Sequence, residues 1–154
     1  MRSSRKTGFT LVEILIVVVI LGILAAIVVP QFTSASNEAI KGALQSQLQT
    51  INTQVELYRV RQQGAYPDFA TNGWSDLVAT DYLKEEPING YTGETDIVAG
   101  DEAASQGYDR DAAVGWTFQN AAAQLDYYTV YAAGYDALND LLFHEPGFGA
   151  PPAP

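Results

Sequence analysis

The run of apolar residues from Phe9 to Val29 constrains this chain more than any other feature. Its only polar side chains are Thr10 and Glu13. At about 1.5 Å per residue, a helix over this run covers roughly 30 Å, the thickness of the hydrocarbon core of a bilayer. The sequence therefore predicts a membrane-spanning helix near the N-terminus.

The charges around this run predict its orientation and exclude one class of partner. Arg2, Arg5 and Lys6 precede the run, and Lys41 is the first base after it. The positive-inside rule then leaves the N-terminus in the cytoplasm and sends the rest across the membrane. The chain has 8 Lys and Arg against 18 Asp and Glu, a net charge of −10. We expect no nucleic-acid partner, since phosphate binding needs clustered bases, whereas a divalent cation is a reasonable ligand.

The composition also argues against an enzyme. The chain has no cysteine, which excludes disulfides, thiol catalysis and thiolate metal sites. His144 is the only histidine, so a Ser-His-Asp triad has no other base and a His-rich zinc site is excluded. No glycine pattern matches a nucleotide-binding loop. We therefore expect a structural or binding protein with no required cofactor.

Glu13 separates the interpretations of the apolar run. A plain single-pass anchor fits its length and flanking charges but gives no reason for a carboxylate in hydrocarbon, which is costly and is functional by default. A cleaved secretory signal has a shorter apolar core of about 7 to 15 residues, although Ser34-Ala35-Ser36 offers a weak cleavage site. A core helix of a soluble protein is rarely apolar on all faces in a chain this small.

Residues 5 to 32, RKTGFTLVEILIVVVILGILAAIVVPQF, closely resemble the N-terminal signature of type IV pilins and of the pseudopilins of type II secretion. The shared features are a short basic leader, a glycine, Phe-Thr-Leu-Val-Glu, and an apolar helix with a proline near its end. The resemblance implies that a prepilin peptidase cleaves after Gly8 and methylates the new amino group of Phe9. Gly8 suits such a site because a residue without a side chain enters a protease cleft easily in an extended form.

Cleavage would remove the basic leader and create an ammonium group on Phe9, four residues from Glu13. The resemblance implies that Glu13 pairs with the N-terminal amine of an adjacent subunit during assembly. Such an ion pair would set the register between subunits more than it would add net stability. The alternative is that Glu13 reaches the membrane interface and pairs with Lys6.

A long helix is expected to continue beyond the apolar run. Pro30 removes one backbone hydrogen bond and, with Gly22, marks where this helix could flex or stretch during assembly. Gly64 supplies a stop signal, so we expect the helix to run to about Gln63. Beyond Pro30, apolar residues recur at helical spacing in one stripe: Leu44, Leu48, Ile51, Val55 and Tyr58.

The remaining sequence predicts a small antiparallel sheet. Residues 115–119 and 125–133 are rich in aromatic and β-branched residues and read as a hairpin. Residues 74–83 suggest a short helix or turn, residues 84–93 a loop, and residues 135–143 a last short helix. The fold class is then α+β, with one long helix packed on a small sheet, and the resemblance implies a pilin-like fold.

The resulting domain plan has five parts. They are a leader peptide (1–8), a transmembrane and assembly helix (9–29), its amphipathic continuation (30–63), a globular pilin-like domain (64–143) and a flexible Pro/Ala-rich tail (144–154).

The middle of the chain is also similar to major pseudopilins, through AYPD at 65–68 and YLKEEPINGYTG at 82–93. It departs from them at 86–90, where Glu-Pro-Ile-Asn-Gly replaces the usual Asp-Pro-Trp-Gly. Major pseudopilins hold calcium in their C-terminal loop, so the resemblance makes calcium a candidate ligand.

One acidic stretch could supply calcium ligands, which are oxygen atoms, six to eight per ion. Residues 109–111 begin like an EF-hand, but Val114 and Asn120 stand where that motif needs a glycine and an acid. A solvated acidic loop is the simpler interpretation. The candidate ligands are Asp96, Asp101, Glu102, Asp109 and Asp111.

Together these features predict a non-enzymatic filament subunit of a type II secretion pseudopilus. It would sit in the bacterial inner membrane with its globular part in the periplasm, polymerise with copies of itself, and meet a prepilin peptidase, an inner-membrane assembly platform and minor subunits. A pilin of an extracellular type IV pilus, serving adhesion, motility or DNA uptake, is the alternative. A membrane-anchored binding protein that never polymerises is the third possibility.

Overall fold

The computed structural model describes residues 8–120 and 128–149. The first seven residues of the expected leader, the link between the two hairpin strands and the last five residues of the tail lie outside the described residues. The chain divides into two compact units, residues 1–37 and 38–154. Helix α1, Leu11–Arg61, contributes to both units.

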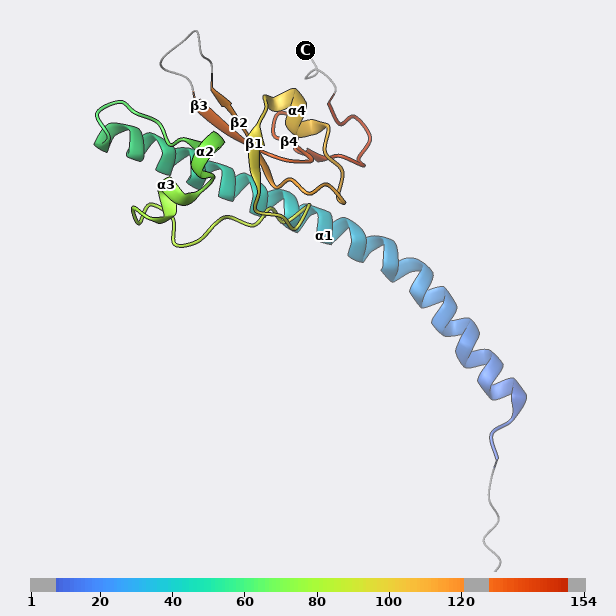
Figure 1. The fold of residues 1–154 in the computed structure, drawn as a ribbon. Helices are drawn as coiled ribbons and strands as arrows, with labels where there is room; N and C mark the ends of the chain where they lie inside the picture. The colour runs from blue at the N-terminus through green and yellow to red at the C-terminus, as the bar shows by residue number, and fades with distance from the viewer. Residues whose placement is uncertain (1–7, 121–127, 150–154) are drawn as a thin grey trace, which may run out of the picture. The chain divides into compact units, whose positions relative to one another are not determined.

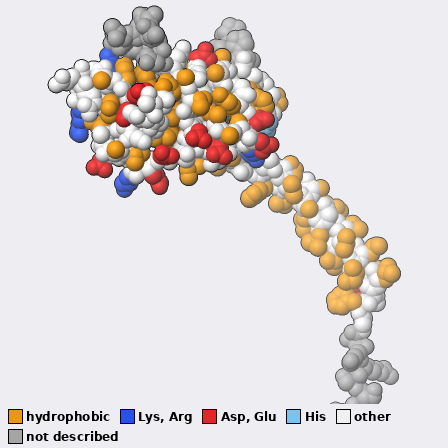
Figure 2. Space-filling view, viewed as in Figure 1, with side chains coloured by type: hydrophobic (Ala, Val, Ile, Leu, Met, Phe, Trp, Pro, Cys, Tyr) orange, Lys and Arg blue, Asp and Glu red, His pale blue; other side chains and the backbone are white. Residues whose placement is uncertain are grey.

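In the first unit, α1 is an apolar helix whose side chains are exposed on all sides. The exposure of its large apolar residues ranges from 49% at Val17 to 81% at Leu11. Figure 2 shows hydrophobic side chains along this part of the helix. Of the described helices, α1 is the one with a stretch long and apolar enough to cross a bilayer, and none of that stretch is buried.

In the second unit, α1 carries the apolar stripe that the sequence predicts. Leu44, Leu48, Ile51 and Val55 are all buried. The helix ends at Arg61, two residues before the expected end, and the backbone N–H of Gly64 donates to the carbonyl of Arg59 at 2.9 Å. Gly64 has a φ of 99°, which glycine adopts without the steric cost of a Cβ. The predicted glycine stop is confirmed.

The sheet beside α1 has three strands in the order β1-β2-β3 (Figure 1). Strands β2 (Trp116–Asn120) and β3 (Tyr128–Ala132) are antiparallel, with Phe118 opposite Val130, which confirms the predicted hairpin. Strand β1 (Ile97–Ala99) runs parallel to β2. The sheet is therefore mixed: the antiparallel pair was predicted, and the parallel strand β1 was not. A parallel pair needs a crossover connection, and the segment containing α4 (Glu102–Gln106) supplies it.

The core lies between the stripe of α1 and one face of this sheet. Two short helices, α2 (Phe69–Asn72) and α3 (Ser75–Val78), close it, so the expected short helix near residue 74 is present. Its buried aromatic side chains are Phe69, Trp74, Tyr91, Trp116, Phe118, Tyr128 and Tyr135. These aromatic rings bury large apolar areas, which allows a small unit without disulfides to keep a stable core.

Two asparagine side chains connect α1 and the 84–93 loop to the sheet by forming hydrogen bonds with its backbone groups. The Asn52 side chain on α1 donates to the carbonyl of Val130 at 3.3 Å and accepts from its N–H at 3.0 Å. Asn89, fully buried in the 84–93 loop, donates to the carbonyls of Gly115 and Ala133. Because buried backbone groups need partners, these contacts fix the helix and the loop against the sheet.

The predicted short helix at 135–143 is wrong. The segment forms a two-stranded antiparallel sheet of β4 (Tyr135–Asp136) and β5 (Leu141–Leu142). The Asp136 carboxylate accepts the backbone N–H groups of Leu138 and Asn139, the type of local bond by which Asp competes with helix formation. Asp140 then has a φ of 54°, in the left-handed region, and the chain reverses there.

Asp136 should make stability depend on acid pH. Burial alone would raise the pKa of its carboxyl, but hydrogen bonds from the Asn139 side chain and from the backbone of Asn139, Gly149 and Leu138 outweigh burial and lower that pKa. A lowered native pKa gives stability that is complete above the ordinary value of 3.8 and is lost as pH falls through the native value. The melting-temperature difference between wild type and Asp136→Asn should therefore be largest near neutral pH and shrink below about pH 4.

Asp81→Asn is the matched control, because it makes the same change of side chain at an exposed position. The positive φ of Asp81 is one that asparagine tolerates. A melting-temperature difference for Asp136→Asn that stays constant from neutral pH to pH 2 would contradict this account.

Candidate assembly site

The start of α1 is held by a reciprocal pair of side chains, Thr10 and Glu13. The backbone N–H and the hydroxyl of Thr10 each donate to Glu13 Oε2 at 2.8 Å. The backbone N–H of Glu13 approaches Thr10 Oγ1 at 3.3 Å. This is a capping box, in which each side chain satisfies a backbone N–H that has no partner inside the helix. The pair explains why the helix begins at Leu11.

The capping box gives Glu13 a role within its own chain. A carboxylate in the first turn also interacts favourably with the positive end of the helix dipole. The backbone N–H and the hydroxyl of Thr10 both donate to Oε2, so the cap uses one oxygen of the carboxylate. The charge of Glu13 made it stand out in the sequence, whereas the role of Thr10 was not predicted. The Thr-x-x-Glu spacing immediately before an apolar run was the signal that could have shown it.

The predicted cleavage site lies directly before this cap. Gly8 and Phe9 precede α1 in irregular backbone, and Phe9 is 81% exposed. Among the described residues, a Cβ added to Gly8 would meet no atom beyond its chain neighbours within 4 Å. The described residues therefore leave Gly8 uncovered, as a protease substrate must be. Cleavage and methylation at this bond stay predictions.

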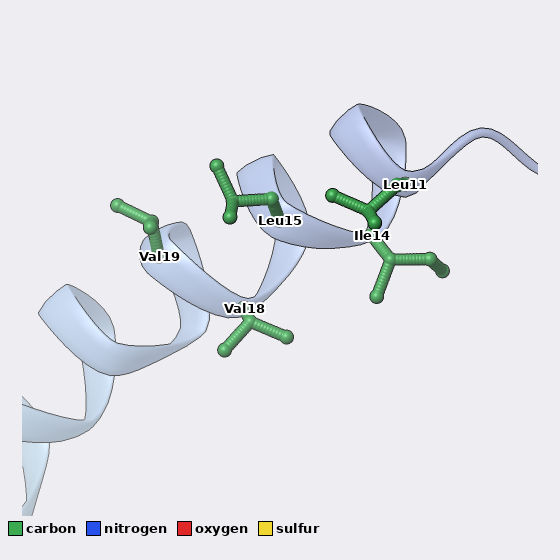
Figure 3. Close-up of a pocket in the computed structure, with 5 residues that line it drawn as sticks. All are labelled: Leu11, Ile14, Leu15, Val18 and Val19. Carbon is green, nitrogen blue, oxygen red and sulfur yellow. The ribbon is translucent and has the colours of Figure 1, made fainter.

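One side of the first turns of α1 forms a shallow apolar groove, shown in Figure 3. Its residues follow one another at steps of three, one, three and one, so they share a single helix face. The groove is lined by Leu11, Ile14, Leu15, Val18 and Val19. A face of this kind packs against the side chains of another helix when one is present.

Pro30 lies inside α1, and the helix continues on both sides of it. Proline has no backbone N–H, so one hydrogen bond of the helix is lost here. Nearby, the hydroxyl of Thr33 donates to the carbonyl of Val29 at 3.2 Å, and that of Ser34 donates to the carbonyl of Pro30 at 3.1 Å. Such bonds compete with the backbone ladder and weaken a helix slightly. A role of Pro30 in assembly stays a prediction.

The acids proposed for calcium have separate partners. Asp101 caps α4 by accepting the N–H of Ala104 at 2.9 Å, and Glu102 lies in the first turn of that helix. The Asp109 carboxylate accepts the N–H of Asp111 at 3.1 Å. Asp96 contributes its backbone carbonyl, which accepts from Gly115 and Trp116. Over residues 8–120 and 128–149, no three His, Cys, Asp or Glu side chains are grouped so that they could hold a metal ion.

The fold of the chain is a pilin-like α+β arrangement, and its N-terminal site lies within a matched motif. A family model described as the prokaryotic N-terminal methylation motif matches residues 3–29, which contain Gly8, Phe9 and the capping box. The long apolar helix on a small mixed sheet is the α+β arrangement expected of this class.

Among characterised proteins, the chain is similar to type II secretion system core protein G. It is 37% identical to that of Pseudomonas aeruginosa over 89 residues, 58% of this chain and 61% of the relative. It is 35% identical to that of Dickeya chrysanthemi over 87 residues, 56% of each. The chain thus spans about three fifths of the length of these curated relatives. No solved structure matches. The resemblance predicted from the sequence is confirmed.

The capping box predicts different outcomes for two substitutions of Thr10. Thr10→Val keeps the size and removes the hydroxyl, so the backbone N–H groups of the first turn should exchange with solvent roughly severalfold faster. Thr10→Ser keeps the hydroxyl and should exchange like wild type. Amide hydrogen exchange of residues 11–14 in detergent micelles measures this.

Thr33→Val is the matched control, because its hydroxyl bonds to a carbonyl in the middle of α1 and should not affect the first turn. Equal exchange at residues 11–14 in Thr10→Val and wild type would mean that the capping box does not stabilise the start of α1.

Proposed function

We propose that this chain is a structural subunit that polymerises through its N-terminal helix into a type II secretion pseudopilus and so supports protein secretion. The observation that carries this proposal is a capped carboxylate, Glu13, at the start of an exposed apolar helix within the matched methylation motif. Its setting would be the bacterial inner membrane, with the apolar part of α1 in the bilayer and residues 38–154 in the periplasm.

The assembled filament would use both oxygen atoms of the Glu13 carboxylate. Cleavage after Gly8 removes the basic leader and leaves an amine on Phe9. Thr10 occupies Oε2 of Glu13, which leaves Oε1 for the Phe9 amine of an adjacent subunit. An unpaired amine and an unpaired carboxylate are both costly in hydrocarbon, so subunits that stack in register neutralise both charges.

The apolar groove of α1 would then receive the neighbouring helix. In hydrocarbon there is little hydrophobic driving force between helices, so close van der Waals packing and polar contacts decide how they associate. The groove from Leu11 to Val19 is lined by apolar side chains alone, and at about 100° per residue Glu13 lies on the opposite side of the helix. The ion pair would set the axial position, and the groove would supply the packing area.

The type IV pilin remains the second candidate, because the methylation motif fits both kinds of filament. The similarity to core protein G extends over 85 to 92 residues in several relatives, far beyond the motif at residues 3–29. This extension favours the pseudopilus. A prepilin peptidase, an inner-membrane platform and minor subunits are the proposed partners. Calcium binding by the acidic stretch at residues 96–111 also stays a prediction.

The mature chain should begin with a methylated Phe9. The expected processing cuts after Gly8, and a methyl group on the new amine adds to the mass of the N-terminal peptide. Mass spectrometry of the protein isolated from membranes of its host measures this. A chain that still begins at Met1, or one cut near Ser36, would contradict the proposed processing.

Glu13→Gln should separate the two roles of Glu13. Glutamine at this position still accepts hydrogen bonds from Thr10, so the capping box should survive, but the charge is lost. We expect normal processing, unchanged exchange of the first helical turn, and loss of filaments by electron microscopy of shear fractions. Glu13→Ala should lose both the cap and the filaments.

Glu86→Gln serves as the control, because it removes a carboxylate from an exposed position in the globular unit. Wild-type filament yield from Glu13→Gln would show that Glu13 acts only as a helix cap and that no ion pair with Phe9 drives assembly.

A further inference from the structure

A buried lysine occupies the apolar stripe of α1. Lys41 lies three residues before Leu44, in step with the stripe, and is only 6% exposed. Its Nζ contacts Glu38 Oε1 at 2.5 Å and Glu145 Oε2 at 3.5 Å. A buried ammonium is costly unless it is paired, so its two partners are energetically significant.

Glu145 belongs to the C-terminal strap, which we define as residues 141–149 (red in Figure 1). Within the strap, Glu145 Oε2 also accepts the backbone N–H of Leu142 at 2.8 Å. Two further contacts fasten the strap to the globular unit. His144 stacks on Tyr91 with ring centroids 6.0 Å apart, and the N–H of Gly149 donates to Asp136 Oδ2 at 3.0 Å.

The carboxylates in and beside the strap already accept hydrogen bonds from donors of the protein. The Asp136 carboxylate accepts from the N–H groups of Leu138, Asn139 and Gly149 and from the Asn139 side chain. Asp140 accepts the hydroxyl of Tyr135 at 2.8 Å. Over residues 8–120 and 128–149, no three acidic side chains are grouped so that they could hold a metal ion. Calcium needs six to eight oxygen ligands, so these acids do not fit a calcium site.

We propose that the Lys41 ammonium is an internal cation that holds the C-terminal strap on α1, so that the strap closes without a divalent ion. The C-terminal-loop calcium that the resemblance to major pseudopilins implies is thus replaced here by a lysine of the helix. This inference does not depend on whether the chain polymerises, because all of its contacts lie within residues 38–149.

The electrostatic surroundings keep Lys41 charged. The hydrogen bond to Glu38 raises the pKa of Lys41, burial opposes this, and the negative charges of Glu145 and Asp140 raise it further. A lysine with a raised native pKa contributes stability that is complete below its ordinary value of 10.5 and is lost as pH rises through the native value. The Lys41 ammonium therefore contributes its full stabilisation at neutral pH.

Amide hydrogen exchange of the full chain in detergent micelles tests this proposal. Wild-type exchange at Leu142, Phe143 and Gly149 should be the same in EDTA and in millimolar calcium chloride. Lys41→Met should speed exchange at these amides by at least about tenfold, because it leaves Glu145 without its cation. Lys41→Arg should restore most of the protection, and Lys84→Met, at an exposed lysine, should change nothing.

If Lys41→Met does not fold, Glu145→Gln tests the same ion pair. It removes only the negative charge of the strap residue that pairs with Lys41, and it should also speed exchange at Leu142. EDTA that speeds strap exchange in wild type, or calcium that slows it, would overturn the proposal. So would wild-type protection in a folded Lys41→Met chain. A calcium effect confined to residues 101–111 would instead report binding at the acidic stretch and leave the strap independent of calcium.

Failure of this proposal is distinguishable from failure of the proposed function. Glu13→Gln should retain the protected strap while losing filaments, since Glu13 lies in the first unit and Lys41 in the second. A strap that responds to calcium would leave the assembly role of Glu13 unaffected.

Discussion

The hydrogen bonds between Thr10 and Glu13 are the interaction on which the proposed function of this chain depends. They start α1 at Leu11 and hold a carboxylate in the first turn of a helix whose following residues are apolar. Without the cap, the first backbone N–H groups would lack partners in an environment without water. With it, the carboxylate is fixed in position before any second subunit arrives. The capping role of Glu13 is therefore compatible with the assembly role proposed for it.

The globular unit achieves stability in a different way. It has no disulfide, and its small aromatic core is supplemented by polar side chains that take the place of backbone partners. Asn52 joins α1 to β3, Asn89 joins a loop to the ends of β2 and β3, and Asp136 organises the turn between β4 and β5. Lys41 joins α1 to the C-terminal strap. Each contact links segments that are distant in sequence or irregular, where helix and sheet hydrogen bonds are not available.

The parts that could be predicted from the sequence are those with a local signal. The stripe from Leu44 to Val55 and the hairpin of β2 and β3 follow from periodicity, and Gly64 marks the end of the helix. The parallel strand β1 and the two-stranded segment at residues 135–142 were missed, because their form depends on the α4 crossover and on the hydrogen bonds of Asp136. The spacing of residues along a helix shows which face of the helix each one occupies. It does not show which distant residue each one contacts, as in the pair of Lys41 and Glu145. The Thr-x-x-Glu spacing at Thr10 was also a local signal, but the cap was not predicted from it.

The central claim is that Glu13 pairs with the amine of a different subunit. Zero-length carbodiimide cross-linking of filaments assembled from equal amounts of isotopically light and heavy chains tests it directly. The cross-link joins the carboxylate of Glu13 to an amine in contact with it, and mass spectrometry of the joined peptides reads both labels. The account predicts peptides in which a light Phe9 is linked to a heavy Glu13 and the reverse. Cross-linked peptides that always carry a single label would place the pair within one chain and contradict the claim.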